Sequence, residues 1–285
     1  MFQTIVKIFL LVIITAAITP FIRELAFVLG AVDNPNARRI NKKPMPTIGG
    51  LAIFVAFNIG EFVLLRKDFP THELFSVLLA SSVIILTGLI DDILELKPRQ
   101  KMFGIFVASL VVYFLAGIKV RELSLPFLGH IQLGWWSFPL TIFWILALTN
   151  AVNLIDGLDG LATGVTLISL VTMGIVGFFF LKSWQHYVPI MCIMLAACLL
   201  GFLPYNFHPA KIFLGDTGAL YIGFMISVLS LKGLKNVTFV SLLVPILILG
   251  VPITDTVYAM IRRKLNKKNI SQADKHHLHH QLMRM

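Results

Sequence analysis

Long apolar runs recur along almost the whole sequence, and each is close to the roughly 20 residues that an α-helix needs to cross a bilayer. Of the 285 residues, 57% are hydrophobic and only 13% are charged, a composition far from that of a soluble domain. We therefore predict an all-α, polytopic integral membrane protein with about nine transmembrane helices, forming a single domain over residues 1–285. The expected spans are 3–22, 48–65, 73–90, 102–117, 137–153, 161–181, 188–205, 217–231 and 237–254.

The linkers between these spans carry different numbers of basic residues on alternate sides. Linkers 33–47, 91–101, 154–160, 206–216 and the tail from Asp255 contain 15 Lys and Arg, whereas linkers 66–72, 118–136, 182–187 and 232–236 contain seven. The positive-inside rule places the first set and the C-terminus in the cytoplasm. Most distinctive polar residues fall in that set, so we expect an active site on the cytoplasmic face. Orientation and phosphate binding explain the net charge of +10, and we expect no nucleic-acid partner.

The segment 150–164, NAVNLIDGLDGLATG, contains amides and carboxylates between two apolar runs. Acids at membrane depth are costly and therefore suggest function. Asn153, Asp156 and Asp159 are spaced by three residues, which predicts that neighbours in the set share roughly one helical face. The glycines of the segment would let a helix or a ligand approach closely. The alternative is a polar, glycine-rich loop between two spans.

Two adjacent acids, Asp91 and Asp92, follow the span 73–90. Neighbouring carboxylates repel each other, so the pair suits a general base, a metal site or a diphosphate bound through magnesium. A solvated helix end is the alternative.

A second acidic position, Asp216, stands in the sequence Gly-Asp-Thr-Gly at the start of the span 217–231. A carboxylate on a tight backbone beside the first amides of a helix can hold a metal-bound anion. Phe213, just before it, could stack on a base, and a membrane-facing Phe is the alternative.

Basic residues at both ends of the chain are candidates for phosphate binding. Lys42 and Lys43 precede two prolines and a glycine pair, and rigidly held lysines suit an anionic ligand; topogenic charge is the alternative. The tail contains His276, His277, His279 and His280. Imidazoles titrate near neutrality and can contact phosphate, so we interpret them as a catalytic or phosphate-binding cluster, with a zinc site as the alternative.

Four motifs, DDILELK, NAVNLIDGLDGLATG, PYNFHPAKIFLGDTGA and DKHHLHHQL, follow one another in this order. Together they resemble the polyprenyl-phosphate N-acetylhexosamine-1-phosphate transferase family over essentially the whole chain. The resemblance implies a multi-pass enzyme of the bacterial inner membrane. Such an enzyme transfers a sugar 1-phosphate from a UDP-activated amino sugar to a polyprenyl phosphate and releases UMP, the initiating step of a cell-surface glycan.

The resemblance also implies a cofactor, Mg²⁺, with Mn²⁺ as an alternative, and a substrate branch. The spacing His277-Leu-His279-His280 is similar to the branch that uses UDP-N-acetylglucosamine. The branch that makes lipid-linked MurNAc-pentapeptide is the alternative, and a nucleotide-sugar transporter is a more distant one. The implied partners are a UDP-N-acetylhexosamine, the polyprenyl phosphate lipid and the membrane, and a homodimer is left open.

Roles for individual residues follow from the same resemblance. Asp91 and Asp92 would face the acceptor phosphate, and Asp216 would bind magnesium on the donor diphosphate. The nucleotide and its diphosphate would be positioned by Asn153, Asp156, Asp159 and Asn206. Phosphate oxygens would be contacted by Lys42, Lys43, His277, His279 and His280.

Overall fold

The computed structural model describes residues 2–34, 44–64, 66, 70–125, 129–181, 186–233 and 250. These residues are mostly helical, in agreement with an all-α membrane protein. The α-helices are α1 (Phe2–Leu29), α2 (Gly50–Ile59), α3 (Thr71–Leu94), α4 (Pro98–Phe114), α5 (Ser137–Ile155), α6 (Leu161–Phe180), α7 (Tyr187–Asn206) and α8 (Gly215–Gly233). A π-helical turn, Gly60–Leu64, extends α2, and a 3₁₀ turn, Gly134–Trp136, precedes α5. Two antiparallel strand pairs were not predicted: β1 (Val32–Asp33) with β2 (Met45–Pro46), and β3 (Glu122–Leu125) with β4 (Gly129–Gln132).

Five of the described helices are long and apolar enough to cross a membrane. They are Gln3–Leu29, Thr71–Leu94, Gly134–Ile155, Leu161–Phe180 and Tyr187–Asn206. Three other predicted spans also form helices, but α2 and α4 are short, and α8 carries an acid in its first turn and a lysine in its last. The span predicted at 237–254 lies outside the described residues, Gly250 excepted. The expected nine spans are therefore not confirmed.

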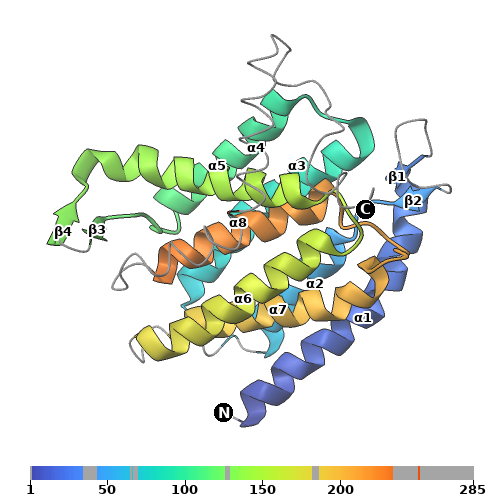
Figure 1. The fold of residues 1–285 in the computed structure, drawn as a ribbon, viewed down its shortest axis with the longest axis horizontal. Coiled ribbons are helices and arrows are strands. Elements are labelled where there is room, and N and C mark those ends of the chain that lie inside the picture. Colours follow the sequence, from blue (N-terminus) through green and yellow to red (C-terminus); the bar gives the residue numbers. More distant parts are fainter. Residues whose placement is uncertain are drawn as a thin grey trace.

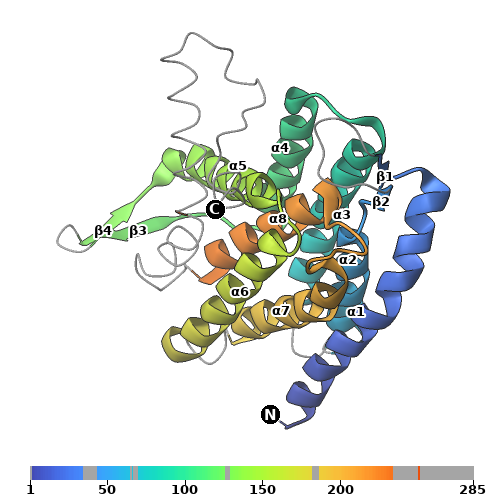
Figure 2. The same cartoon turned by 45° about the vertical axis from the view of Figure 1, so that its right-hand side comes forward.

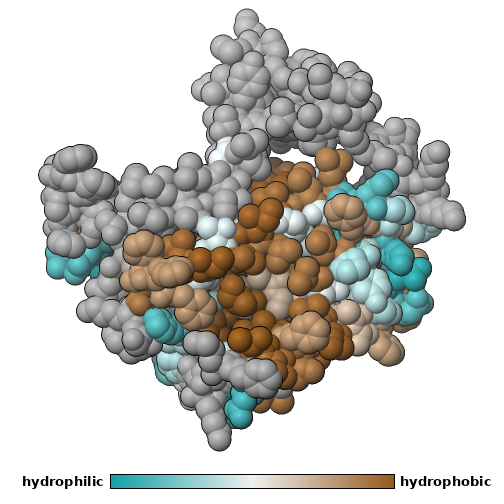
Figure 3. Space-filling view, turned by 60° about the horizontal axis from the view of Figure 1, so that its bottom comes forward, coloured by the Kyte–Doolittle hydropathy of each residue, from teal (hydrophilic) through white to brown (hydrophobic). Residues whose placement is uncertain are grey.

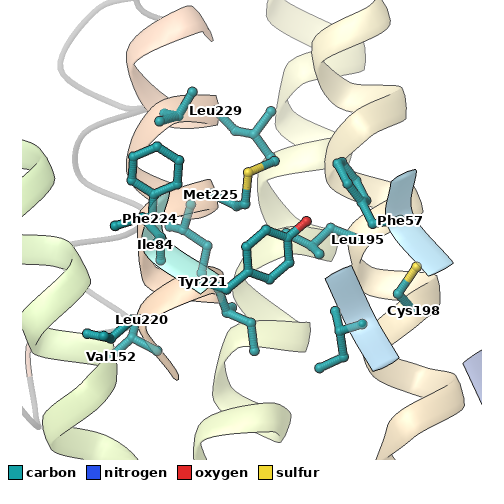
Figure 4. Packing of buried hydrophobic residues seen from close by; sticks show 14 of the residues in the cluster. Phe57, Ile84, Val152, Leu195, Cys198, Leu220, Tyr221, Phe224, Met225 and Leu229 are labelled. Atoms are coloured by element: carbon teal, nitrogen blue, oxygen red, sulfur yellow. The ribbon is translucent and has the colours of Figure 1, made fainter. Parts of the chain in front are cut away.

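Helix α8 lies at the centre of the bundle (Figures 1 and 2). It packs most extensively against α3 and α5 and also contacts α2, α6 and α7. Every residue from Thr217 to Lys232 is buried, as expected for a helix that is surrounded by other helices. In the N-terminal half of α8, the ring of Tyr221 meets that of Phe54 edge to face, with centroids 5.4 Å apart, and Figure 4 shows Phe57 and Leu195 beside it.

The outer surface of the bundle is strongly apolar. Helix α1 lies at the rim against α7 (Figure 1) and exposes large side chains such as Phe9, Phe21 and Val28. The space-filling view in Figure 3 shows a broad hydrophobic area bordered by hydrophilic residues. In water so large an apolar surface would be unusual, whereas in a bilayer it is the surface that faces lipid.

The helix ends that flank the polar motifs lie together at one end of the bundle. The C-terminal ends of α3, α5 and α7 meet the N-terminal ends of α4, α6 and α8 there. The loop between α7 and α8 lies beside β2 (Figures 1 and 2), where the N–H of Phe213 donates to the carbonyl of Pro46 at 2.8 Å. The carbonyl of Phe213 in turn accepts from the N–H of Gly49 at 3.1 Å. We call this region the site end.

Candidate active site

The first turn of α8 is held in place by close backbone packing at the centre of the site end. Gly215 has φ +71°, in the left-handed region that favours glycine, and a Cβ at this position would collide with the carbonyl oxygen of Thr47. A Cβ on Gly88 of α3 would equally collide with the backbone of Thr217. The position of Asp216 is therefore set by backbone contacts from two sides.

Asp92, on the neighbouring helix α3, caps the N-terminus of α8. Its carboxylate accepts hydrogen bonds from the N–H of Asp216 at 3.0 Å, the N–H of Thr217 at 2.9 Å and the hydroxyl of Thr217 at 2.6 Å. The first amides of a helix have no partner inside it, and the helix dipole favours a negative charge there. Asp92 is thus a helix cap supplied by another element, and both of its oxygens are engaged.

Asp91 belongs to a bridge that joins three helices. Its side chain is nearly buried; Oδ1 accepts from the N–H of Leu96 at 2.7 Å, and Oδ2 lies 2.5 Å from Nζ of Lys101. The same Nζ lies 2.9 Å from Oδ1 of Asp216, which also accepts a hydrogen bond from the amide of Asn153. Lys101, at the start of α4, therefore connects the acid of α3 with the acid of α8.

Lys101 is a site residue that the predicted set did not include. This role had little support in the sequence, because Lys101 belongs to a basic stretch, 97–101, of the kind that flanks cytoplasmic helix ends in membrane proteins. The contact depends on α4 packing against α3, which brings Lys101 to Asp91 and to Asp216 of α8.

The prediction of a helical face shared by Asn153, Asp156 and Asp159 is wrong. Helix α5 ends at Ile155, so both acids lie in the turns that lead to α6. The glycines of this segment explain the break, because Gly160 adopts φ +71° directly before α6 begins. Within the segment 150–164, residues 156–160 form a glycine-rich loop, whereas residues 150–155 end α5 and residues 161–164 begin α6. The polar residues of the segment do reach the site end.

Asp156 and Asp159 differ in their surroundings. Burial, followed by repulsion from Asp216 and more weakly from Asp92 and Asp159, raises the pKa of Asp156 to about 8. Asp159 instead binds the loop between α7 and α8: its Oδ2 lies 3.0 Å from Nδ1 of His208 and accepts the N–H of Ala210 at 3.1 Å. The surroundings of Asp156 therefore favour its protonated form, while Asp159 orders a neighbouring loop.

Asn206, the last residue of α7, is buried beside that loop. Its Oδ1 accepts the hydroxyl hydrogen of Thr163 at 2.7 Å, and its Nδ2 donates to the carbonyl of Ile212 at 3.2 Å. Both ends of the amide thus maintain the loop, and substrate binding by Asn206 stays a prediction. The side chain of Phe213 is half-buried near Asp216, so its predicted stacking on a base is also untested.

The remaining predicted site residues lie outside the described part of the chain: Lys42, Lys43, His277, His279 and His280.

The acids at the site end fit a magnesium ion that is completed by substrate. Magnesium takes oxygen ligands and is usually held by one or two carboxylates together with substrate phosphates. Asp216 and Asp91 would provide the carboxylates, and both already contact one cation, Nζ of Lys101, at 2.9 Å and 2.5 Å. Within the described residues, no three His, Cys, Asp or Glu side chains form a ready-made metal centre. Substrate phosphates would therefore have to supply the missing ligands.

Comparison with known proteins places these residues in a family. The profile of glycosyl transferase family 4 matches residues 74–234. Over 268 residues, the chain is 45% identical to a probable undecaprenyl-phosphate N-acetylglucosaminyl 1-phosphate transferase of Bacillus subtilis, covering 93% of this chain and 73% of that protein. It is 33% identical over 300 residues to a decaprenyl-phosphate N-acetylglucosaminephosphotransferase of Mycolicibacterium smegmatis, covering 96% and 73%. It is 34% identical over 259 residues to a phospho-N-acetylmuramoyl-pentapeptide-transferase of Clostridium botulinum, covering 86% and 76%.

The chain therefore belongs to glycosyl transferase family 4. More narrowly, it is a member of the polyprenyl-phosphate hexosamine-1-phosphate transferases, as its four motifs indicated. It is accordingly an enzyme, and the transporter alternative is set aside.

Proposed function

We propose that the chain transfers N-acetylglucosamine 1-phosphate from UDP-N-acetylglucosamine to undecaprenyl phosphate and so begins the synthesis of a cell-surface glycan. An oxygen of the lipid phosphate bonds to the sugar-bearing phosphorus of the donor, and the bond from that phosphorus to the bridging oxygen breaks. UMP leaves with the bridging oxygen and its electron pair. The observation that carries this proposal is the Asp91–Lys101–Asp216 bridge beside an apolar surface, in a chain that is 45% identical to a transferase of this name.

The bridge suits a reaction between two anions. A phosphoryl transfer needs little covalent help from a protein, so positioning and charge neutralisation provide most of the catalysis. Lys101 already neutralises part of the charge of two carboxylates, and its ammonium can turn toward a phosphate oxygen without leaving the site. The lipid explains the membrane setting, because its phosphate must meet a soluble nucleotide sugar at the interface.

Bound Mg²⁺, or Mn²⁺ in its place, would neutralise the donor diphosphate and orient it. Asp216 would hold the ion, with Asp91 as the second carboxylate. Asp91 would also take up the proton of a monoanionic acceptor phosphate. A phosphate monoester has its second pKa at about 6, so this base matters mainly at lower pH. We favour direct attack by the lipid phosphate, since it is already a nucleophile.

The proposed setting is the bacterial inner membrane, with the site end in the cytoplasm and about nine spans. The excess of Lys and Arg in linkers 33–47, 91–101, 154–160 and 206–216 and in the tail from Asp255 supports this orientation. A homodimer stays an open proposal for the assembly.

The decisive experiment offers the purified protein two labelled donors, UDP-N-acetylglucosamine and UDP-MurNAc-pentapeptide, each with undecaprenyl phosphate and Mg²⁺. We expect butanol-extractable label and stoichiometric UMP from the first donor. Label from the second donor alone would assign the chain to the pentapeptide branch, which the Clostridium botulinum relative represents. No lipid-linked label from either donor would refute the proposal.

A further inference from the structure

The Asp159–His208 pair lies at the site end, yet the proposed chemistry does not use it. The two residues come from different loops, one before α6 and one after α7. The carboxylate of Asp159 is largely covered, with 26% of its side-chain surface exposed, whereas the ring of His208 is 81% exposed. Asp159 is therefore the covered member of the pair, and His208 is the exposed one.

The anchoring determines how the imidazole is presented. A carboxylate at 3.0 Å from Nδ1 favours the tautomer with hydrogen on Nδ1 and restrains the ring. The other nitrogen, Nε2, then points away from Asp159, and none of the described residues pairs with it. In the doubly protonated form of the ring, Nδ1–H donates to Asp159 and Nε2–H is a donor that an anion can accept.

The loop that carries His208 is itself well held. Asp159 also accepts the N–H of Ala210, and the N–H of Lys211 donates to the carbonyl of Tyr205 at 2.8 Å. A Cβ on Gly160 would lie only 3.1 Å from the ring of Phe207, so the two loops are packed together. The ring of His208 is thus exposed without being on a loose segment.

The charges around the pair indicate what Nε2 could bind. The site end holds the carboxylates of Asp91, Asp92 and Asp216, together with Asp156, whose raised pKa favours its neutral form. Among the described residues, Lys101 is the basic side chain that forms ion pairs with these acids, and its ammonium is already shared by Asp91 and Asp216. A nucleotide diphosphate entering here needs further donors, and the loop of His208 leads directly to Asp216.

We propose that His208 binds a diphosphate oxygen of the nucleotide-sugar donor through Nε2, and that Asp159 is a positioning residue that acts through this ring. The inference rests on the proposed function and deepens it. It changes the predicted role of Asp159, from direct contact with the donor to orientation of His208. A purely structural pair, in which the ring only ties the two loops together, is the competing account.

Two substitutions at His208 separate these accounts, because each keeps one of the two nitrogens. In His208→Asn the side-chain amide can still donate to Asp159 but does not reach the position of Nε2. In His208→Gln the amide reaches the position of Nε2 but loses the bond to Asp159. We expect His208→Asn to raise the donor KM about tenfold, as for loss of a charge-assisted bond, with kcat and melting temperature close to wild type. We expect His208→Gln to retain more donor affinity and to melt at a lower temperature.

A third variant tests whether Asp159 acts through the ring. Asp159→Asn should raise the donor KM, and its combination with His208→Asn should be no worse than His208→Asn alone, since residues acting as one unit are not additive. His72→Asn, at an exposed histidine on the opposite end of α3, is the control and should leave the donor KM unchanged.

The wild-type enzyme distinguishes failure of this inference from failure of the proposed function. If wild type forms lipid-linked N-acetylglucosamine but His208→Asn has a normal donor KM, the ring is structural and the inference is wrong. A raised acceptor KM with a normal donor KM also overturns it. If wild type makes no product with this donor, it is the proposed function that fails.

Discussion

Lys101 is the residue on which the charge balance of the site end depends most directly. Lys101→Met removes the cation between Asp91 and Asp216, and breaking a buried ion pair on one side is strongly destabilising because it leaves an uncompensated charge. We expect kcat to fall by at least about 100-fold, in line with loss of an electrostatic group at a reacting centre. Lys101→Arg should retain part of the activity. The control is Lys97→Met at an exposed neighbouring position, and initial rates within about threefold of wild type for Lys101→Met would exclude the proposed role.

Asp216 is the carboxylate that we expect magnesium to need. Asp216→Asn replaces a charged oxygen ligand with a neutral amide, a poor ligand for a hard cation. Turnover should be lost and should not return as the magnesium concentration is raised in a rate titration. Activity within about tenfold of wild type, roughly 1.4 kcal/mol of barrier, would remove Asp216 from the metal site.

Asp156 gives the fold a pH dependence of predictable sign. Its pKa of about 8 in the folded protein lies above the ordinary value of 3.8, so between these values the folded state binds a proton that the unfolded state lacks. Stability from this group is present at low pH and is lost as pH rises through about 8. Asp156→Asn cannot titrate, so its melting temperature relative to wild type should increase between about pH 6 and about pH 8.5, measured in EDTA. A constant difference across this range would show that Asp156 is already ionised at pH 6.

The acids of the site could be predicted from the sequence, but several of their contacts could not. Acids in an apolar chain are conspicuous because they are costly in a membrane. Lys101 and His208 are conspicuous only in the folded state, since each meets its acid through the packing of separate elements. The same holds for Asp92, whose bonds to α8 span 124 or 125 residues of sequence.

At the scale of elements, the contact between the end of α3 and the start of α8 fixes the positions of the site residues on these two helices. Asp92→Ala removes three acceptor contacts, and Thr217→Val removes only the hydroxyl among them. We expect Asp92→Ala to lower both the melting temperature and kcat, and Thr217→Val to lower them less, with cap loss costing about 0.5–2 kcal/mol. The double variant should resemble Asp92→Ala, because both substitutions affect one cap. Fully additive losses in melting temperature would mean that the two residues act independently.

Hydrophobic periodicity predicted the helices themselves well and their ends less well. Runs 161–181 and 188–205 correspond closely to α6 and α7, because an apolar segment between polar loops has few other ways to satisfy its backbone in lipid. Helix α3 extends to Leu94, beyond the predicted end at 90, and so carries both Asp91 and Asp92 in its last turns. A hydropathy criterion ends a helix before the polar residues of its last turn. In this chain those terminal turns contain the acids of the candidate site.

At the scale of the whole molecule, the alternation of linkers predicted that the polar motifs would meet on one side. Within the described part of the chain, linkers 91–101, 154–160 and 206–216 do meet at one end of the bundle. The prediction for most of linker 33–47 and for the tail from Asp255 falls outside the described residues. Which side of the membrane that end faces is a separate question. It rests on the distribution of Lys and Arg, which acts during insertion and leaves no mark on the packing.

Membrane sidedness can be measured with single cysteines and an impermeant thiol reagent. The two native cysteines, Cys192 and Cys198, are buried and should give no background. Glu95 and Lys211 are exposed at the site end, whereas Arg121 is exposed at the opposite end, before β3. We expect Glu95→Cys and Lys211→Cys to be protected in intact cells and to react after permeabilisation, while Arg121→Cys reacts in both. A cysteine at position 270 in the basic tail should behave like the first two.

Labelling of Glu95→Cys and Lys211→Cys from outside, with Arg121→Cys protected, would invert the topology. The site would then be separated from cytoplasmic UDP-N-acetylglucosamine, and the proposed reaction could not take place there.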